Sequence, residues 1–110
     1  MNAGELREQI GIELEALDLI VDELLSLQQD VTGRKVSVRE KTAAAAFLAQ
    51  FYTGIENILK RISQFQGVSL PTGDAWHIEL FKRFCAPSHP DLPVLFDPAL
   101  ASAYLQVIDL

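Results

Sequence analysis

Two long stretches of the sequence repeat their apolar residues with the period of an α-helix, and these repeats restrict what the chain can fold into. In residues 5–29, five apolar residues alternate at spacings of four and three: Ile10, Leu14, Leu17, Val21 and Leu24. In residues 38–65, a second set forms the main apolar face: Ala44, Phe47, Leu48, Phe51, Ile55, Ile58, Ile62 and Phe65. Such faces need neighbouring helices to cover them. The pattern therefore predicts a helical bundle.

The segment between these stretches carries signals that end one helix and begin the next. Gly33 is the expected stop for the first helix. Ser37 and Glu40 have the spacing of a capping box, in which each side chain accepts from the other residue's backbone N–H. The connection is short, so we expect the two helices to run antiparallel.

Two shorter helices are predicted in the remainder of the chain. Asp74 is the expected N-cap of the first, in which Trp76, Leu80 and Phe84 share one face. The second begins at Pro98 with Asp97 as its N-cap.

A proline-rich connection separates these two helices, and its apolar residues predict that it packs on the bundle. Those residues are Leu92, Val94, Leu95 and Phe96. No strand pattern is present, so residues 1–110 read as a single all-α domain, an antiparallel bundle of two long and two shorter helices.

Composition excludes several classes of protein. The chain is 49% hydrophobic and has one cysteine, so a disulfide framework is excluded, and a reducing cytoplasm is the expected setting. We expect Cys85 to be a buried, unreactive thiol. The longest apolar run, AAAAFLA, is shorter than the ~18 residues that a membrane span needs, and the N-terminus lacks the apolar core of a secretory signal.

The net charge of −6 is unevenly distributed along the chain. Residues 1–30 hold eight acids against one base, which indicates either a solvated helix face or an acidic surface for a basic partner. An acidic protein is a poor non-specific binder of nucleic acid. Four basic residues near the start of the second helix are expected to pair with Asp22, Glu23 and Asp30, with RNA contact as the alternative: Arg34, Lys35, Arg39 and Lys41.

Polar residues on the second and third helices are candidates for a functional site. Glu56 and Lys60 have the spacing of a helical ion pair. Glu56 and Asn57 interrupt a largely apolar helix, where a structural hydrogen bond is the simpler role. For His77 we expect a place at a packing seam rather than a metal or catalytic role, since no second ligand has suitable spacing. No phosphate-binding loop or metal cluster is present in the sequence, and we expect no cofactor.

The stretch REKTAAAAFLAQFYTGIENILKRISQFQGVSLPTGDAWHIELFKRFC resembles the HEPN superfamily, in particular the HepT-like ribonuclease toxins. The similarity covers about residues 1–103 and is most specific from Arg39 to Phe84. It implies an all-α, HEPN-like bundle, a homodimer, and a neighbouring nucleotidyltransferase that acts as antitoxin.

The resemblance also implies a chemistry. HEPN ribonucleases cleave RNA without metal, using an Arg followed a few residues later by a His, with the motifs of two protomers meeting at the dimer interface. In HepT-like members this motif follows the helix that begins here at Asp97. The sequence reads YLQVIDL at that place, with neither Arg nor His, so we expect a protein truncated before the family's catalytic motif and C-terminal helices.

A possible substitute motif lies upstream, where Arg83 and His89 are separated by FCAPS. Its context, with Pro87 and Pro90 around the histidine, favours surface residues at a helix end. A metal-independent ribonuclease that uses this pair is therefore an alternative hypothesis only.

The favoured hypothesis is a non-catalytic HepT-like protein that self-associates or binds a nucleotidyltransferase antitoxin. A helical adaptor with another partner is the third. Without later helices to cover the two long ones, their apolar faces would be exposed, so we expect a homo-oligomer, most simply a dimer. The expected interface residues are Leu17, Val21, Leu24, Ala44, Phe47, Leu48 and Phe51.

Overall fold

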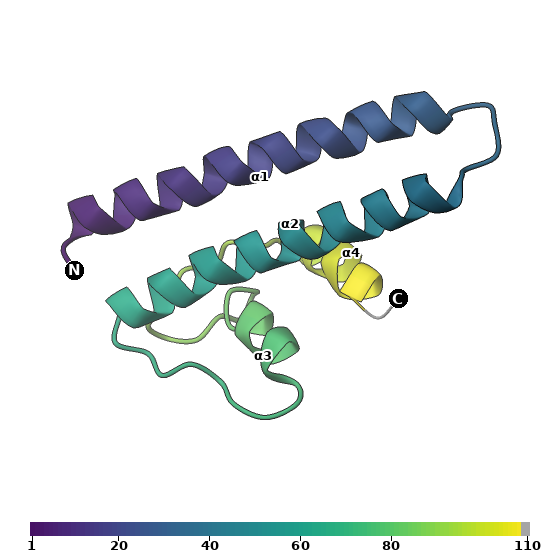
Figure 1. The fold of residues 1–110 in the computed structure, drawn as a ribbon. Coiled ribbons are helices and arrows are strands. Elements are labelled where there is room, and N and C mark those ends of the chain that lie inside the picture. The colour runs from purple at the N-terminus through teal and green to yellow at the C-terminus, as the bar shows by residue number, and fades with distance from the viewer. Residues whose placement is uncertain (109–110) are drawn as a thin grey trace.

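The computed structural model describes residues 1–108, and the fold there is all-α, as predicted (Figure 1). Four helices follow one another along the chain: α1 (Ala3–Val31), α2 (Val38–Phe65), α3 (Trp76–Lys82) and α4 (Pro98–Ile108). Helices α1 and α2 form a long antiparallel hairpin, and α3 and α4 lie beside α2, away from α1 (Figure 1). Within the described residues no strand forms, although Cys85 and Phe96 make an isolated β-bridge.

The ends of the two long helices follow the local sequence signals. Helix α1 begins at Ala3, slightly earlier than expected, because the Asn2 side chain accepts from the backbone N–H of Glu5 at 2.8 Å. Gly33 adopts a φ of 81°, a left-handed conformation that favours glycine after a helix end. The capping box at the start of α2 is confirmed, since the N–H of Glu40 donates to Ser37 Oγ at 3.2 Å and the N–H of Ser37 donates to Glu40 Oε1 at 2.9 Å.

The short helices confirm one cap and contradict the other. Asp97 caps α4, because its Oδ1 accepts from the N–H of Leu100 at 2.7 Å. The prediction for Asp74 was wrong: Ala75 occupies the N-cap position of α3 and no side chain caps the helix. A backbone bond from Trp76 N–H to the Gly73 carbonyl, at 3.3 Å, closes the preceding turn instead.

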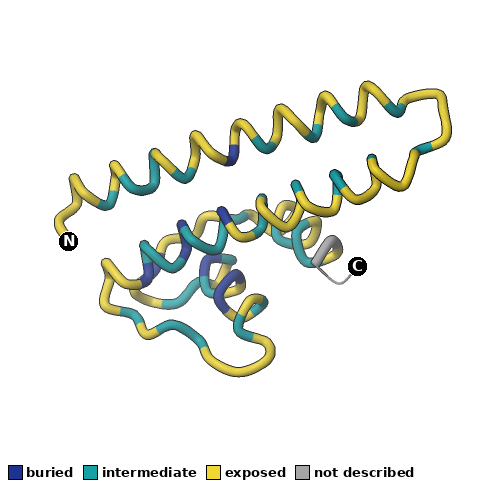
Figure 2. The backbone as a smooth tube through the Cα atoms, in the orientation of Figure 1, coloured by how far each residue is buried: buried dark blue, intermediate teal, exposed yellow. Residues whose placement is uncertain are grey.

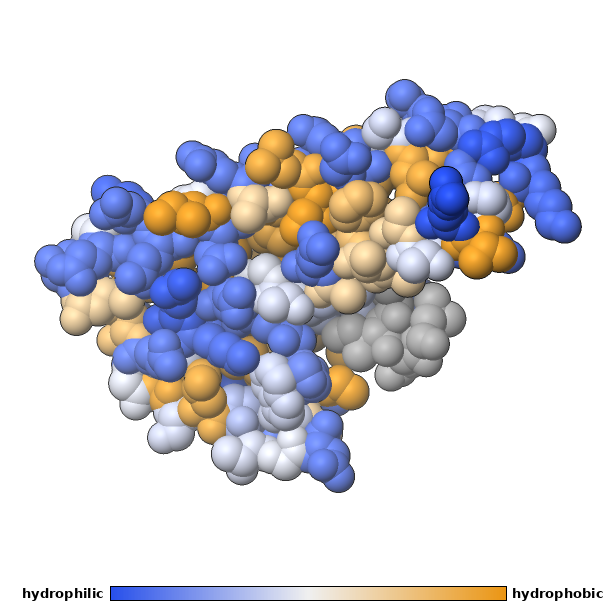
Figure 3. All heavy atoms as spheres, viewed as in Figure 1, coloured by the Kyte–Doolittle hydropathy of each residue, from blue (hydrophilic) through white to orange (hydrophobic). Residues whose placement is uncertain are grey.

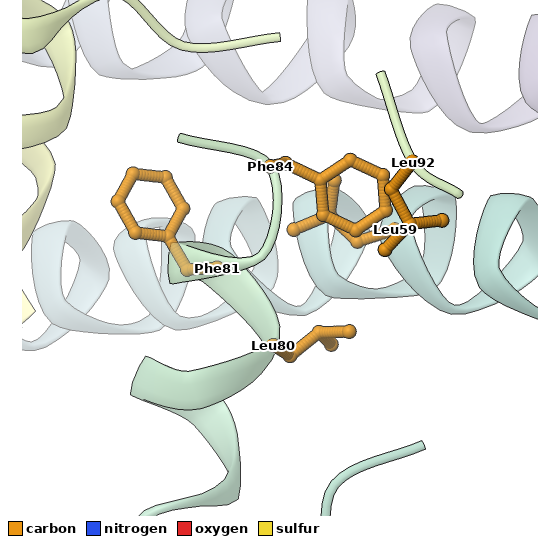
Figure 4. Close-up of a cluster of buried hydrophobic side chains, with 5 residues drawn as sticks. All are labelled: Leu59, Leu80, Phe81, Phe84 and Leu92. Carbon is orange, nitrogen blue, oxygen red and sulfur yellow. The ribbon is translucent and has the colours of Figure 1, made fainter. Parts of the chain in front are cut away.

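The core lies between the C-terminal half of α2, α3 and the connection that follows α3. Five buried apolar side chains form it (Figure 4): Leu59, Leu80, Phe81, Phe84 and Leu92. Leu92 and the half-buried Phe96 confirm that the connection packs on the bundle. Val94 and Leu95 are exposed, contrary to expectation, because the N–H groups of Leu95 and Phe96 both donate to the Phe84 carbonyl and hold this stretch at the edge of the core.

Helix α1 contributes little to this core. Its one buried residue is Leu17, 6% exposed, which packs on Gly54 of α2. The remainder of α1 is exposed or half-buried (Figure 2). The radius of gyration is 15.9 Å, against about 13 Å for a compact domain of this length. The hairpin therefore extends beyond the part of the molecule that holds the core.

Candidate functional site

Arg83 and His89 approach each other through the backbone, but their side chains serve different parts of the chain. The N–H of His89 donates to the Arg83 carbonyl at 3.0 Å. The Arg83 guanidinium donates to the Ser69 carbonyl at 2.6 Å and lies 3.6 Å from Glu79. The His89 ring accepts from the N–H of Asp91 at 3.1 Å. Both side chains therefore stabilise local structure, and they do not converge on one point where a phosphate could bind.

Glu56 and His77 form a polar contact between α2 and α3. Glu56 Oε1 lies 2.7 Å from His77 Nδ1, and the glutamate is the more buried of the two. The predicted pair of Glu56 with Lys60 is therefore replaced by a contact to a residue 21 positions away. This pair fits the structural role expected for each residue, since it joins two helices at a packing seam.

Aromatic side chains of α2, α3 and α4 pack against one another. The Tyr104 ring stacks on Phe81 with centroids 4.0 Å apart, and it meets Tyr52 edge-on at 5.0 Å. Burial, together with the Glu56 charge, raises the pKa of Tyr104 above its usual value, and burial also raises the pKa of Tyr52. Both phenols therefore stay protonated near neutral pH.

Cys85 is half-buried, not fully buried as expected. Burial raises the pKa of its thiol, which donates to the Phe81 carbonyl at 3.5 Å. A raised pKa keeps the thiol in its less nucleophilic form. The structure thus supports an unreactive cysteine.

The basic residues near the start of α2 do not make the expected pairs. Arg34 pairs with Glu40, six residues further along the chain, and within the described residues no ion pair joins this group to Asp22, Glu23 or Asp30. The turn through residues 35–37 places the Arg34 guanidinium against the first turn of α2. This hydrogen bond, with those from Ser37, lowers the pKa of Glu40 to about 2.

A contact that sequence reasoning missed joins α1 to α2. The Arg61 guanidinium donates to Gln9 at 2.7 Å and lies 3.4 Å from Glu13. These partners are about fifty positions away in sequence. No local pattern indicates such a contact, because it depends on the register of the hairpin.

Lys60 and Trp76 line a small pocket between α2 and α3. The Lys60 ammonium lies 4.5 Å from the centroid of the Trp76 ring. The pocket has a volume of about 220 Å³, and Leu70, Pro71 and Leu80 form the rest of its wall.

The residues expected at an oligomer interface differ in burial. Leu17 is buried within the hairpin against Gly54. Val21 and Leu48 are exposed. The others are half-buried: Leu24, Ala44, Phe47 and Phe51. The structure thus leaves part of this set available for contact and uses part of it for packing α1 on α2.

Neither a metal cluster nor a membrane span is found in the described part of the chain. Among residues 1–108, no three His, Cys, Asp or Glu side chains come close enough to hold a metal ion. None of the helices described is both long and apolar enough to cross a bilayer.

Comparison with known proteins gives one match. A family model described as HepT-like protein matches residues 43–106, which is more than half of the chain. The match covers most of α2, all of α3 and α4 as far as Gln106, and it leaves α1 outside. No curated protein and no solved structure matches the chain.

Proposed function

Because this chain belongs to the family of HepT-like proteins, we propose that it is a non-catalytic member of the toxin–antitoxin type, which acts in the cytoplasm by associating with a second copy of itself. The observation that carries the proposal is an apolar side of the α1–α2 hairpin that α3 and α4 leave uncovered. The single cysteine, which leaves no partner for a disulfide within the chain, supports the cytoplasmic setting.

The two sides of the hairpin can be distinguished from the contacts between α1 and α2. A groove on one side is lined by Ala16 and Ile20 of α1 and by Thr53 and Asn57 of α2. At 100° per residue, other apolar residues project on the opposite side of the Leu17–Gly54 contact. We call this second side the hairpin face, and its residues are Leu14, Val21, Leu25, Ala44, Leu48 and Phe51.

The hairpin face combines exposure with size. Leu14 and Leu25 are 50% and 53% exposed, which is unusual for leucines that share one stripe of a helix. Apolar residues also gather over the middle of the side of the hairpin that Figure 3 shows, between polar ends. From Leu14 to Leu25 the face extends about 17 Å along α1, so two helices about 20 Å wide give an apolar patch of roughly 350 Å², a size typical of interaction sites. A two-fold dimer through this face would cover the exposed leucines.

The non-catalytic part of the proposal is supported by the Arg83 and His89 side chains. An HEPN-type reaction needs an arginine free to hold a phosphate and a histidine free to move a proton. Here the guanidinium is engaged by Ser69 and Glu79, and Nδ1 of the imidazole accepts from the N–H of Asp91.

Sedimentation or light scattering at micromolar concentration tests the association. We expect a dimer for the wild type and a monomer with unchanged helical circular dichroism for Leu25→Lys and Leu48→Lys. Lysine is a good helix former, so these exposed sites tolerate it. Leu19→Lys is the matched control, since Leu19 is exposed on the outer side of α1, and this variant should remain dimeric. A monomeric wild type, or equal dissociation of the control, would overturn the proposal.

RNA cleavage tests the absence of catalysis. We expect the purified protein to leave single-stranded RNA intact in the absence of metal. Cleavage by the wild type that disappears in both Arg83→Ala and His89→Ala would overturn the non-catalytic assignment and establish the ribonuclease alternative.

A second candidate function is favoured by the outer side of α1. Ile12 and Leu19 are 61% and 68% exposed there, about 10 Å apart along the helix, among acidic residues of a segment with eight acids and one base. This combination suits a basic amphipathic helix on a partner protein. The resemblance implies that the partner is a nucleotidyltransferase antitoxin. We expect the wild type and Leu25→Lys to co-purify with such an antitoxin, and Ile12→Lys and Leu19→Lys to lose this association. Co-purification of all three variants would contradict this second function.

A further inference from the structure

The pocket between α2 and α3 has no part in the association proposed above. It lies beside the C-terminal half of α2, and the loop after α2 supplies Leu70 and Pro71. Leu80, which is fully buried, and the Trp76 indole complete its apolar wall. Its volume of about 220 Å³ corresponds to roughly seven water molecules of about 30 Å³ each. The pocket is open to solvent and is large enough to hold a ligand with a single ring.

One cation lines this apolar pocket. The Lys60 ammonium lies over the Trp76 ring, and none of the ion pairs among the described residues includes Lys60. Glu56, which precedes Lys60 by one helical turn, is engaged by His77 instead. Lys60 is half-buried, so water screens its charge less than that of a fully exposed lysine. A positive charge in this position favours an anionic group in the pocket.

The chemistry of the wall narrows the ligand class. A lysine ammonium has three N–H donors, so contact with the indole face leaves N–H groups free for an anion. One lysine balances one negative charge, which suits a carboxylate better than a doubly charged phosphate ester. The apolar residues suit a hydrocarbon body, as in small-molecule sites where a few polar groups orient an apolar ligand.

We propose that this pocket binds a small monocarboxylate with an apolar body, such as an arylacetic acid. The carboxylate accepts hydrogen bonds from Lys60 Nζ. The ring or chain packs against Leu70, Pro71 and the Trp76 indole, with Leu80 buried behind them.

Intrinsic fluorescence tests this proposal directly, because Trp76 is the only tryptophan in the chain. The wild-type protein is titrated with phenylacetate, with neutral phenylacetamide, and with inorganic phosphate. We expect a saturable change in Trp76 emission with phenylacetate, and affinity about tenfold higher for the acid than for the amide, since a charge-assisted hydrogen bond is worth at least that ratio. Phosphate should compete weakly or not at all.

Variants distinguish the pocket from non-specific binding. Lys60→Gln should lose the preference for the acid while keeping its fold by circular dichroism. Leu70→Ala should weaken both ligands to a similar degree. Lys35→Gln is the matched control, since it removes an exposed lysine in the α1–α2 turn, and it should bind as the wild type does. Amide shifts of residues around the pocket, followed by NMR, provide a second readout if Lys60→Gln changes the basal emission.

Three results would overturn the proposal. The first is no saturation up to about 10 mM phenylacetate, well above millimolar affinity. The second is equal affinity for acid and amide in the wild type, or an unchanged preference in Lys60→Gln. The third is tighter binding of phosphate than of phenylacetate, which would assign the pocket to phosphate instead.

Discussion

Replacement of Gly54 by alanine should destabilise the protein, although alanine is the better helix former. Gly54 lies in the middle of α2, under Leu17 of α1. A Cβ atom added at Gly54 would lie 2.6 Å from Leu17 Cδ2 and 3.2 Å from Leu17 Cγ. Since Leu17 is only 6% exposed, its side chain has little room to turn away. Either Leu17 adopts a poorer rotamer or α1 moves outward.

Two opposing effects set the magnitude. Alanine in place of glycine stabilises a helix interior by about 1 kcal/mol. Overpacking by one carbon typically costs about 1–3 kcal/mol. We therefore expect Gly54→Ala to lower the free energy of unfolding by about 1 kcal/mol. In the Leu17→Ala background the overlapping atoms are gone, so the same change should raise it by about 1 kcal/mol. The two positions should thus show a coupling of about 2 kcal/mol.

Urea denaturation followed by circular dichroism measures all four members of this cycle. The protein concentration must be held constant, because dimerisation would add to the apparent stability. The decisive observation is the sign of the Gly54→Ala effect in the two backgrounds. If the substitution stabilises both by the same amount, Leu17 does not pack closely on Gly54 and the described geometry of the hairpin is wrong.

Three further predictions concern the capping box, the alkaline range and the core. Arg34, then Ser37, hold the pKa of Glu40 at about 2 instead of 4.5, so its carboxylate adds stability that is complete above pH 4.5 and lost as the pH falls toward 2. Thermal unfolding over that range should depend less on pH in Glu40→Gln than in the wild type. Burial raises the pKa of Tyr104. Above pH 10 its phenol therefore ionises more readily in the unfolded chain than in the folded one, which lowers the stability of the folded state. Urea midpoints should show a smaller loss of stability above pH 10 in Tyr104→Phe than in the wild type. Phe84→Ala should cost about 3–5 kcal/mol in urea denaturation, because Phe84 is fully buried in the core, whereas Phe65→Ala, at an exposed helix end, should cost much less.

Features determined by neighbouring residues could be predicted from the sequence. The capping box of Ser37 and Glu40, which begins α2, and the left-handed Gly33, which follows the end of α1, each depend on a few adjacent residues. Asp74 shows the limit of this reasoning. A residue suited to capping does not cap when a backbone bond, here from Trp76 to Gly73, already closes the turn.

Pairings between helices could not be predicted, because they depend on how the helices cross. Glu56 and His77 were each recognised as polar residues at a packing seam, but only the position of α3 brings them to 2.7 Å. The contact of Arg61 with Gln9 depends in the same way on the register of the hairpin. Lys60 lost its expected helical partner for this reason, and the pocket that it lines with Trp76 has no signature in the sequence.

The uneven burial along the chain has a consequence for how the protein opens. Detaching α1 exposes one fully packed leucine and breaks the contacts of Arg61, whereas opening the core between residues 59 and 92 exposes five buried side chains. We therefore expect α1 to open at a lower free energy than the core, which native-state amide hydrogen exchange would detect. A detached α1 can pair with the α2 of another molecule through the same Leu17–Gly54 contact, so the hairpin also provides a route to dimers that exchange α1.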